Sequence, residues 1–506
     1  MSNARSLRAV TVVAALSMLA VACGQKPGVH VDGPAVVVAA PGGDGQVATP
    51  GGSADGGQLG TDGTGAGTGD APSGGTAGSG QGAGGTGGAT TPGDTGGATT
   101  PGTGGTSTGG DSTGGGSTGG GGTGGGTGGQ QLTPTGSDRT GLTADVIKIG
   151  LHAPVTGAAP IPATSFEKSG DLYWDHIFKT EGQTLLGRSD VELTFRDDKY
   201  DPASARQVCR ELEATTFIFA GGGGTDQIQA CGQFAAVAQV PYFSAGVTEI
   251  GLEGNDWYFA SSMTYRQQGI LLAQYVARNF AGQNTAAIVT STPNFDDAVA
   301  GWEQGVAASG VTYNGTLRHS KGDSSWYSTF ANQLKNDGVE VIYILSSPAD
   351  YIRFAQQASA LDYHPQYVGV GISKGLNAVL TNGCDDVDGG IFFSPFPGLD
   401  WARQNRPQFF AAGESYGKPT DDLALALWGV AEQQHQLLQA YGATYGNDLT
   451  REDFRALVET QTIEAGVFPT VDFARNGHFG GTAIHVLKAN CATTEHETLA
   501  TFATSF

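Results

Sequence analysis

The fold class follows from VIKIGLHAPVTG, the stretch at residues 146–157. Its first six residues form a mostly apolar run with three β-branched side chains, which is typical of a buried strand. The run is followed by Pro154, Thr156 and Gly157, which favour a loop. After the loop come a helical pattern over 166–180 and a second apolar strand at 191–195. A strand, a helical crossover and another strand predict two parallel neighbours in one sheet.

The same alternation of strands and helices continues along the chain in two successive blocks. Two such blocks predict an α/β fold with two doubly wound parallel-sheet lobes. Trp174 and Trp428 lie on helical apolar stripes and are expected in the core. A hairpin-like stretch, 471–473 with 483–488, is expected to close the chain. Further strands are predicted at 217–220, 241–244, 285–289, 312–317, 339–345, 366–370 and 390–393, and further helices at 203–214, 228–237, 265–280, 295–308, 326–336, 349–360, 374–380, 421–441 and 451–460.

The carboxyl ends of the predicted strands are rich in Gly, Ser and Thr. In open α/β sheets, ligands bind outside these ends. Backbone N–H groups and hydroxyls there can hold a carboxylate or another small polar group. The same residue types also form turns and caps, so any single loop is weak evidence, whereas six such loops in two lobes predict a ligand site. The candidate residues are Thr156, Gly224, Thr225, Ser244, Gly246, Thr248, Phe295, Ser346, Ser347 and Ser373.

Residues 1–22 have the pattern of a signal peptide. Arg5 and Arg8 precede a mostly apolar run of 14 residues, shorter than the ~20 residues that span a bilayer. The run ends in LAVACG, where the small residues before Cys23 resemble the lipobox of bacterial lipoproteins. That resemblance implies cleavage before Cys23 and a lipid on its thiol, which anchors a protein without spanning the membrane. An ordinary signal peptide with an incidental Cys is the alternative.

Glycine divides the rest of the chain, because 45 of the 83 glycines precede residue 141. Residues 23–139 have little to bury, so we expect a disordered Gly/Thr-rich tether there. Residues 140–506 are long enough for one large domain or two lobes. Residues 141–506 carry 22 Lys and Arg against 40 Asp and Glu. A domain this acidic repels phosphate backbones, so nucleic acid is not an expected partner.

Four cysteines remain when Cys23 is set aside, and they allow three pairings. The oxidising conditions met by an exported protein make disulfides plausible. Pairing Cys209 with Cys231 is local and leaves Cys384 and Cys491 to close a long loop. The sequence has no C-x-x-C spacing and no His near these cysteines, so we expect neither a metal nor a cofactor.

Short motifs in a characteristic order resemble the type I periplasmic binding proteins of the branched-chain amino acid (Leu/Ile/Val-binding) ABC transporter family. IKIGL followed by PVTG is similar to the family's opening strand and loop, and DDKYDP at 197–202 resembles its next turn. PYFS at 241–244 resembles a first-lobe strand, and 469–480 resembles the closing segment. The resemblance covers about 140–490. A disulfide known in the family matches Cys209 and Cys231.

The resemblance implies two lobes joined by a three-crossover hinge that closes on a small-molecule ligand. The closed form would be presented to an ABC permease with ATPase subunits. We therefore expect a monomeric binding protein rather than an enzyme, lipid-anchored on the extracytoplasmic side of the cell membrane. The implied crossovers lie near Ser261, Ser394 and Thr482, with lobe one at about 140–262 and 395–481 and lobe two at about 263–394 and 482–506.

The resemblance also implies ligand residues, with one departure from the family pattern. The acid that pairs with a ligand ammonium falls near Gly371, where the chain has no Asp or Glu. Loss of such a partner costs about 1.5–3 kcal/mol for an ammonium ligand. An amino acid, an amide and a small carboxylate therefore all remain candidates. The other implied positions are Gly224 or Thr225, Thr248 beside Ser244 and Gly246, Phe295, Ser346 with Ser347, and Ser373.

Two alternatives to a transport protein remain. GISKG at 371–375 matches the G-x-S-x-G nucleophile elbow and lies between a predicted strand and helix. The pattern is short, the HGGG-type oxyanion loop is missing, and the two-lobe pattern runs through it unbroken, so a secreted serine hydrolase is the minority hypothesis. A sensory binding lipoprotein without a transporter is the other. The hydrolase would combine Ser373, Asp388 or Asp472, and His478 or His485.

Overall fold

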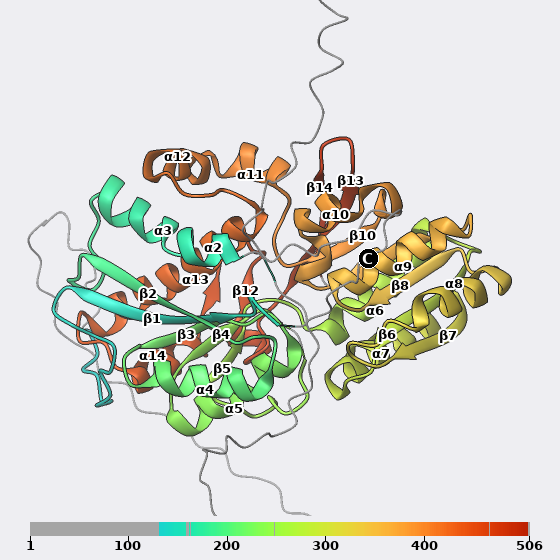
Figure 1. Cartoon of the computed structure of the whole chain (residues 1–506). Helices are drawn as coiled ribbons and strands as arrows, with labels where there is room; N and C mark the ends of the chain where they lie inside the picture. Colours follow the sequence, from blue (N-terminus) through green and yellow to red (C-terminus); the bar gives the residue numbers. More distant parts are fainter. Residues whose placement is uncertain (1–130, 158–160, 162, 247, 465, 504–506) are drawn as a thin grey trace, which may run out of the picture. The chain divides into compact units, whose positions relative to one another are not determined.

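The computed structural model describes residues 131–157, 161, 163–246, 248–464 and 466–503, which belong to one compact unit (Figure 1). The expected signal peptide, the lipidated Cys23 and the Gly/Thr-rich tether up to residue 130 lie outside these residues. Two sheets organise the described part of the chain. We call the first sheet with the helices packed on it lobe one, and the second sheet with its helices lobe two.

In the described residues, lobe one is built on a five-stranded sheet of order β2-β1-β3-β4-β5, in which every neighbouring pair is parallel. Side chains of β3 and β4 alternate between the two faces. Phe219 and Tyr242 pack under α4 and α5, whereas Ile218 and Phe243 join the cluster formed with α13. The elements are β1 (Val146–Ala153), α2 (Ala163–Lys168), α3 (Leu172–Asp175), β2 (Asp190–Asp197), α4 (Pro202–Glu213), β3 (Ile218–Gly221), α5 (Thr225–Ala238), β4 (Tyr242–Ser244), β5 (Tyr258–Ala260), α12 (Pro407–Tyr416), α13 (Asp422–Tyr445), α14 (Arg451–Val458), β11 (Thr462–Ile463), β12 (Val471–Asp472) and α15 (Phe473–Asn476).

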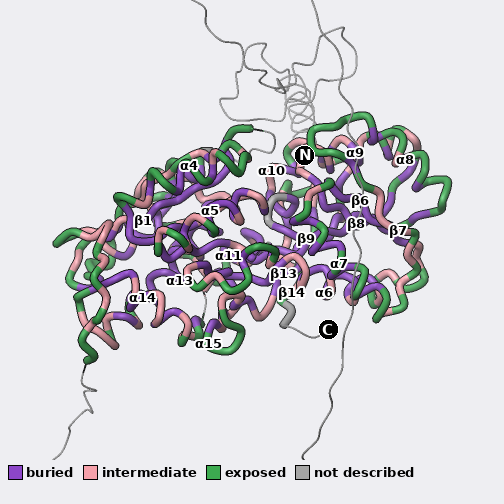
Figure 2. Tube along the Cα trace, turned by 90° about the horizontal axis from the view of Figure 1, so that it is seen from below, coloured by how far each residue is buried: buried purple, intermediate pink, exposed green. Residues whose placement is uncertain are grey.

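Lobe two has, within the described ranges, a seven-stranded sheet of order β14-β13-β10-β9-β8-β6-β7. The strands from β10 to β7 are parallel, and β13 and β14 extend the sheet as an antiparallel hairpin. β8 is buried throughout, as expected for a central parallel strand covered by helices on both faces (Figure 2). The elements are α6 (Tyr265–Asn279), β6 (Asn284–Thr290), α7 (Pro293–Ser309), β7 (Thr312–His319), α8 (Trp326–Asn336), β8 (Val341–Leu345), α9 (Pro348–Ala360), β9 (Gln366–Val370), α10 (Asn377–Val387), β10 (Ile391–Ser394), β13 (Ala483–Asn490) and β14 (Glu495–Ala503). α11 (Leu399–Asn405) contacts both β14 and α12, and its buried residues belong to the lobe-one core.

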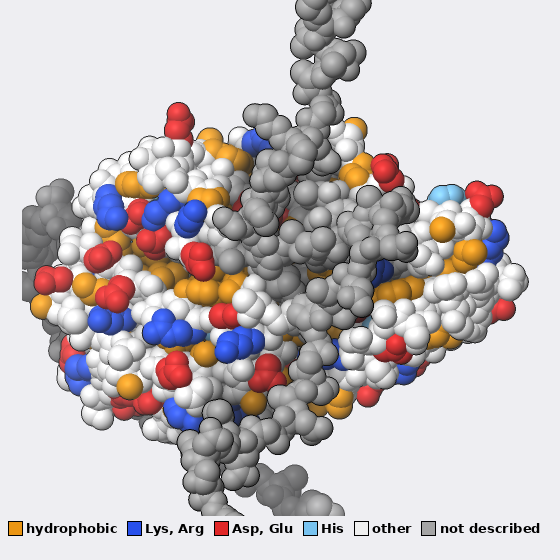
Figure 3. All heavy atoms as spheres, in the orientation of Figure 1, with side chains coloured by type: hydrophobic (Ala, Val, Ile, Leu, Met, Phe, Trp, Pro, Cys, Tyr) orange, Lys and Arg blue, Asp and Glu red, His pale blue; other side chains and the backbone are white. Residues whose placement is uncertain are grey.

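These sheets confirm the predicted α/β fold with parallel strands. Trp174 and Trp428 are both 1% exposed, as expected for core residues. In the described part, the chain passes between the two sheets at three places: between β5 and α6, after β10, and between β12 and β13. Acidic and basic side chains are intermixed on the lobe-one surface seen in Figure 3 rather than separated by sign.

Two predicted elements are wrong in detail. The single helix expected at 166–180 is divided into α2, α3 and a π-helical turn (His176–Thr180), because Gly170 interrupts it. The expected closing hairpin does not form: β12 pairs with β11, whereas β13 pairs with β14. β14 is an edge strand with many polar residues, so its sequence has too weak an apolar pattern to predict a strand. The short strand β5 and the helices α11 and α12 were also not predicted.

The two disulfides follow the pairing in which Cys209 bonds to Cys231 and Cys384 bonds to Cys491. Cys209 on α4 bonds to Cys231 on α5, with 5.9 Å between their Cα atoms. Cys384 on α10 bonds to Cys491 just after β13, with 5.4 Å between Cα atoms. Each bond therefore joins two elements of the same lobe, so neither disulfide restrains movement of one lobe against the other.

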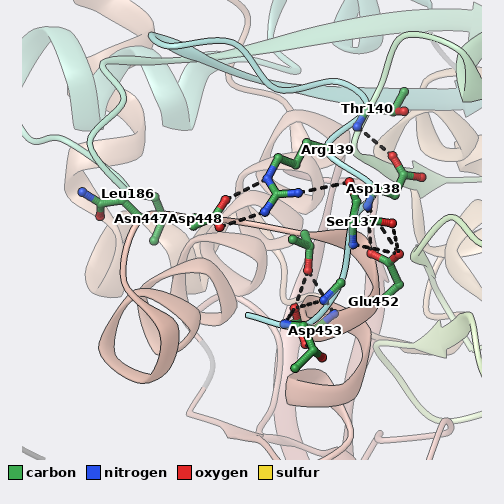
Figure 4. Close-up of polar contacts among 12 residues, drawn as sticks. Ser137, Asp138, Arg139, Thr140, Leu186, Asn447, Asp448, Glu452 and Asp453 are labelled. Carbon is green, nitrogen blue, oxygen red and sulfur yellow. Dashed lines mark hydrogen bonds and ion pairs between the residues drawn. The ribbon is translucent and has the colours of Figure 1, made fainter. Parts of the chain in front are cut away.

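The first described residues are held against α14 by charged and polar contacts (Figure 4). The backbone N–H groups of Thr135 and Gly136 donate to the Asp453 carboxylate at 2.9 and 2.8 Å. The Arg139 guanidinium forms two 2.8 Å bonds with Asp448. Behind them, buried Arg451 pairs with Asp138 at 2.9 Å. We call these residues the N-terminal anchor; they connect the start of the described chain to lobe one.

Candidate ligand-binding site

A pocket of about 130 Å³ lies where the carboxyl ends of strands from both lobes meet. Lobe one contributes the loop after β3 and the residues that end β4, and lobe two contributes the loop after β8 and the turn after β9. This is the position at which open α/β sheets bind ligands. The described lining residues nearest the strand ends are Gly221, Gly222, Gly223, Gly224, Thr225, Ser244, Ala245, Ser261, Ser346, Ser347, Pro348 and Lys374.

One wall of the pocket is a continuous apolar face of α13. Leu423, Ala426, Leu427 and Val430 follow the i, i+3, i+4, i+7 spacing that places side chains on one side of a helix. Further apolar side chains come from separate segments, so most of the ligand's surroundings are hydrocarbon. These are Ile161, Phe166, Phe243, Phe295 and Phe468.

The described lining also contains one buried cation. Lys374 lies in the 3₁₀ turn Ile372–Gly375 and is 3% exposed. No described residue forms a hydrogen bond or ion pair with its ammonium, and the described lining contains no Asp or Glu. Burial lowers the pKa of Lys374 to about 8. The turn replaces the start of the helix predicted at 374–380; α10 begins only at Asn377.

Tyr200 and Tyr265 also line the pocket, and their hydroxyls have no hydrogen-bond partner among the described residues. Burial raises the pKa of Tyr265 to about 12 and that of Tyr200 still further, so both phenols stay neutral and can donate hydrogen bonds. Lys374 and the two phenols thus supply donors, and the lining supplies no charged acceptor.

The glycine-rich loop after β3 depends on positive backbone angles. Gly221 and Gly222 have φ values of +97° and +99°, and a Cβ on Gly222 would lie 2.9 Å from the Tyr242 hydroxyl. That hydroxyl also lies 2.8 Å from Nε2 of His152, whose Nδ1 lies 2.9 Å from the Asp198 carboxylate. The Tyr242 hydroxyl donates to the Gly221 carbonyl at 3.2 Å. A buried polar chain therefore supports the loop from the side away from the pocket.

Several contacts connect the lobes around the pocket. The side chains of Thr292 and Asn294, at the start of α7, donate to the Asp226 carboxylate at the start of α5 at 3.1 and 2.6 Å. The Lys321 ammonium lies 4.1 Å from the centre of the Tyr200 ring. These contacts can exist only when the lobes are closed on each other.

A further contact between the lobes is buried. The backbone N–H of Asn377, the first residue of α10, donates to the Asp422 carboxylate of α13 at 2.6 Å. Burial raises the pKa of Asp422 to about 7. The Asp422 carboxyl group thereby joins α13, which lines the pocket, to α10, which follows the turn of Lys374.

Six of the ten residues proposed from the sequence line this pocket. Three others have partners outside the lining: the Thr156 hydroxyl donates to Asp197 at 2.5 Å, the Gly246 N–H donates to the Ser262 hydroxyl at 2.8 Å, and the Thr248 hydroxyl accepts from the Ile250 N–H at 3.1 Å. Ser373 is in the turn of Lys374. The residues in the lining are Gly224, Thr225, Ser244, Phe295, Ser346 and Ser347.

Sequence reasoning missed Lys374, the two tyrosines and the apolar face of α13. Lys374 belongs to the GISKG motif at 371–375, and the useful signal is a lysine shortly after an apolar strand. α13 is buried on nearly every side, with 16 of its residues buried, so its sequence did not show which face meets a ligand.

The residues of the hydrolase hypothesis have other partners. His478 pairs with Glu459 and with the Tyr258 carbonyl, and His485 lies 2.8 Å from the Thr501 hydroxyl. Asp388 accepts from the Cys491 N–H, and Asp472 caps α15. Among the described contacts, no hydrogen bond joins either Asp to either His. The structure therefore favours binding over the triad chemistry.

Among the described residues, two groups of side chains have metal-like spacing, and neither has the character of a metal site. One is His152 with Cys209 and Cys231, whose sulfur atoms form a disulfide. The other, Asp256 with Glu459 and His478, lies beside the Arg455 guanidinium. Separately, no helix in the described ranges has the length and apolar character needed to cross a membrane.

Comparison with known proteins gives one family and many structures of the same fold. A family model described as periplasmic binding protein matches residues 146–495. The curated proteins include no match. A fatty acid ABC transporter substrate-binding protein from Thermomonospora curvata has a TM-score of 0.63 and 17% identity, with 73% of this chain and 95% of that chain covered.

Two further structures show the same fold. A leucine binding protein from Thermotoga maritima has a TM-score of 0.59 and 16% identity, with coverage of 71% of this chain and 99% of that one. A solute binding protein from R. palustris, solved in complex with benzoate, has a TM-score of 0.58 and 17% identity, with coverage of 71% and 96%. At these identities the structures establish the fold and leave the ligand open.

Proposed function

Because the chain belongs to the periplasmic binding protein family, we propose that it is the solute-binding protein of an ABC importer. In this proposal it captures a small molecule between its lobes and delivers it to a membrane permease. The observation that carries the proposal is the pocket at the carboxyl ends of strands from both lobes, enclosed by contacts between the lobes. Such a pocket can form only when the lobes close.

The connections between the lobes suit a closing motion. Three segments join the sheets, and both disulfides lie within a lobe, so rotation at these segments leaves the covalent cross-links intact. A ligand that touches α13 of lobe one and the turn after β9 of lobe two favours the closed state by its differential affinity. The closed surface is then available for recognition by a permease and its ATPase subunits.

Membrane attachment completes the proposal. We place the lipid on Cys23 and the Gly/Thr-rich segment between the lipid and lobe one, with the protein acting as a monomer. The family is extracytoplasmic, and two disulfides agree with an oxidising compartment. Labelling cells with a fatty acid analogue tests the anchor: the full chain should incorporate the label and Cys23→Ser should not.

The binding role is tested with a variant that fills the pocket. Ala426→Phe places a ring on the apolar face of α13, and Ala443→Phe, exposed on the same helix, is the matched control. A panel of amino acids, amides and small carboxylates is screened by thermal unfolding of the full chain. A ligand at about a thousand times its Kd adds ~4 kcal/mol of stability, and this shift should survive in Ala443→Phe and be lost in Ala426→Phe.

Delivery is tested in intact cells that lack the gene. Uptake of the labelled ligand should fall in these cells and recover with the full chain but not with Ala426→Phe. Unchanged uptake would contradict the transport role while leaving ligand binding in place, as expected for a sensory protein.

A further inference from the structure

We propose that the ligand is a small apolar monocarboxylate without an ammonium group, and that the Lys374 ammonium binds its carboxylate. The inference rests on the proposed function, because it names the class of solute held in the same pocket. It depends on three features of the described residues: an unpartnered buried cation, an apolar wall opposite it, and the absence of acidic groups from the lining.

The first feature is the unpaired charge. A buried ammonium normally has a carboxylate or several oxygen atoms within hydrogen-bond distance, because burial without a partner is strongly unfavourable. Lys374 is 3% exposed and has no partner among the described residues. Its side chain lines the pocket, so a ligand oxygen can reach it. A carboxylate supplies the missing charge and accepts its hydrogen bonds.

The second feature is the shape of the apolar wall. Leu423, Ala426, Leu427 and Val430 form one face of α13, and Phe295 from lobe two also lines the pocket. A hydrocarbon or aromatic body packed there gains roughly 25 cal/mol for each Å² of apolar surface removed from water. A ligand with many hydroxyls, such as a sugar, would leave polar groups unpaired against this wall.

The third feature separates acids from amino acids. An α-amino acid brings an ammonium group into the site with its carboxylate, and an ammonium forms its strongest hydrogen bonds with acceptors of negative charge. The described lining has no Asp or Glu, and it already contains one cation in Lys374. A second cation therefore adds repulsion and finds only neutral acceptors in the described lining. The hydroxyls of Tyr200 and Tyr265 can serve instead as additional donors to the carboxylate.

The experiment compares matched ligands by calorimetry on the full chain at pH 7. The probes are benzoate, 4-methylpentanoate and octanoate, each with its amide, and leucine, which is 4-methylpentanoate with an added ammonium. At least one acid should bind 10- to 100-fold tighter than its own amide, the range expected for a hydrogen bond to a charged group. 4-Methylpentanoate should bind at least tenfold tighter than leucine.

Lys374→Met tests the residue, and Lys488→Met, an exposed lysine on β13, is the matched control. In Lys374→Met the preference for acid over amide should fall to about one, whereas Lys488→Met should keep it. This ratio compares two ligands on the same protein, so a loss of folded protein cannot imitate it.

The outcomes separate the inference from the proposed function. Tighter binding of leucine than of 4-methylpentanoate, or an acid preference that persists in Lys374→Met, would overturn the inference and leave the solute-binding role standing. Binding of no acid, amide or amino acid would count against both.

Discussion

Lys374 and Arg451 are two basic residues in equally buried positions with opposite surroundings. Arg451 is 1% exposed and Lys374 is 3% exposed. The Arg451 guanidinium donates to the carbonyls of Phe217, Glu213 and Thr216 and pairs with Asp138 at 2.9 Å. Lys374 has no such partner among the described residues. Burial alone lowers its pKa to about 8.

The difference shows how to distinguish a structural charge from one kept for a ligand. All the acceptors of Arg451 belong to the protein, so folding completes its hydrogen bonds and it holds the N-terminal anchor to lobe one. Lys374 faces a cavity, so its hydrogen bonds can be completed only by something that enters from outside. The following predictions test this distinction, and each compares a variant with the unaltered chain.

The largest effect is expected for Arg451→Met. The substitution takes away the ion-pair partner of Asp138, whose side chain is 32% exposed, and leaves three carbonyls without this donor. We expect a loss of about 3–5 kcal/mol in the free energy of unfolding, because each unsatisfied buried acceptor costs ~1–3 kcal/mol. Urea denaturation measures the change. Arg139→Met is the matched control, because Arg139 and Asp448 are 45% and 56% exposed, and exposed pairs contribute about 0–1 kcal/mol. Equal losses in the two variants would remove the distinction between them.

The same substitution at Lys374 should have the opposite sign. Lys374→Met replaces an unpaired buried cation with an apolar side chain of similar length, so the ligand-free protein should gain about 1–3 kcal/mol in the free energy of unfolding at pH 7. Urea denaturation again measures the change. A loss of stability would show that Lys374 has a structural partner, as Arg451 has.

The pH dependence of binding should follow the charge on Lys374. Its pKa is lowered to about 8, so the ammonium is present below that pH and is lost above it. Asp422, which joins the lobes, has a pKa of about 7, so the test is made above pH 8, where affinity for a carboxylate should fall roughly tenfold per pH unit. The other titratable groups of the described lining, Tyr200 and Tyr265, have raised pKa values and stay neutral over this range. In calorimetry on Lys374→Met, the affinity for the carboxylate should not change with pH in this range. An equal decline of affinity in both proteins would contradict the assignment of Lys374 as the group that binds the carboxylate.

The smallest effect is expected for Lys321→Met at the rim of the pocket. Its ammonium lies over the Tyr200 ring and spans the two lobes, a contact worth about 0.5–1 kcal/mol when exposed. Ligand affinity should fall two- to fivefold, with urea stability unchanged within ~0.5 kcal/mol. Lys488→Met should alter neither. A loss as large as that of Lys374→Met would place Lys321 in the binding site itself.

Much of this fold was readable from local patterns. The apolar run at 146–151 became the inner strand β1, and the continuous apolar run of β8 became a strand buried on both faces. The predictions failed where pattern is weak: Gly170 broke a helix that apolar spacing had extended, and the polar edge strand β14 displaced the expected closing hairpin. Edge strands and short elements bury little surface, so their sequences carry little hydrophobic periodicity.

The candidate site was readable only in part. The loops after β3, β4 and β8 were expected from their Gly, Ser and Thr content, and they do line the pocket. Their polar character suggested a polar ligand, because the sequence did not show which residues form the other wall of the pocket. That wall is α13, which begins about 200 residues after the glycine loop and contributes only hydrocarbon.

The sequence by itself determined the alternation of strands and helices, the two-lobe organisation and the loops at the strand ends, because hydrophobic periodicity and turn chemistry act over a few neighbouring residues. Tertiary structure alone decided which side chains share the pocket and which charges have partners. Whether a lysine is paired depends on atoms brought from distant segments, and local pattern cannot distinguish Lys374 from a solvated surface lysine. The fold places Lys374 in the same pocket as α13 and buries its charge with no acceptor among the described residues, and so makes that charge available to a ligand.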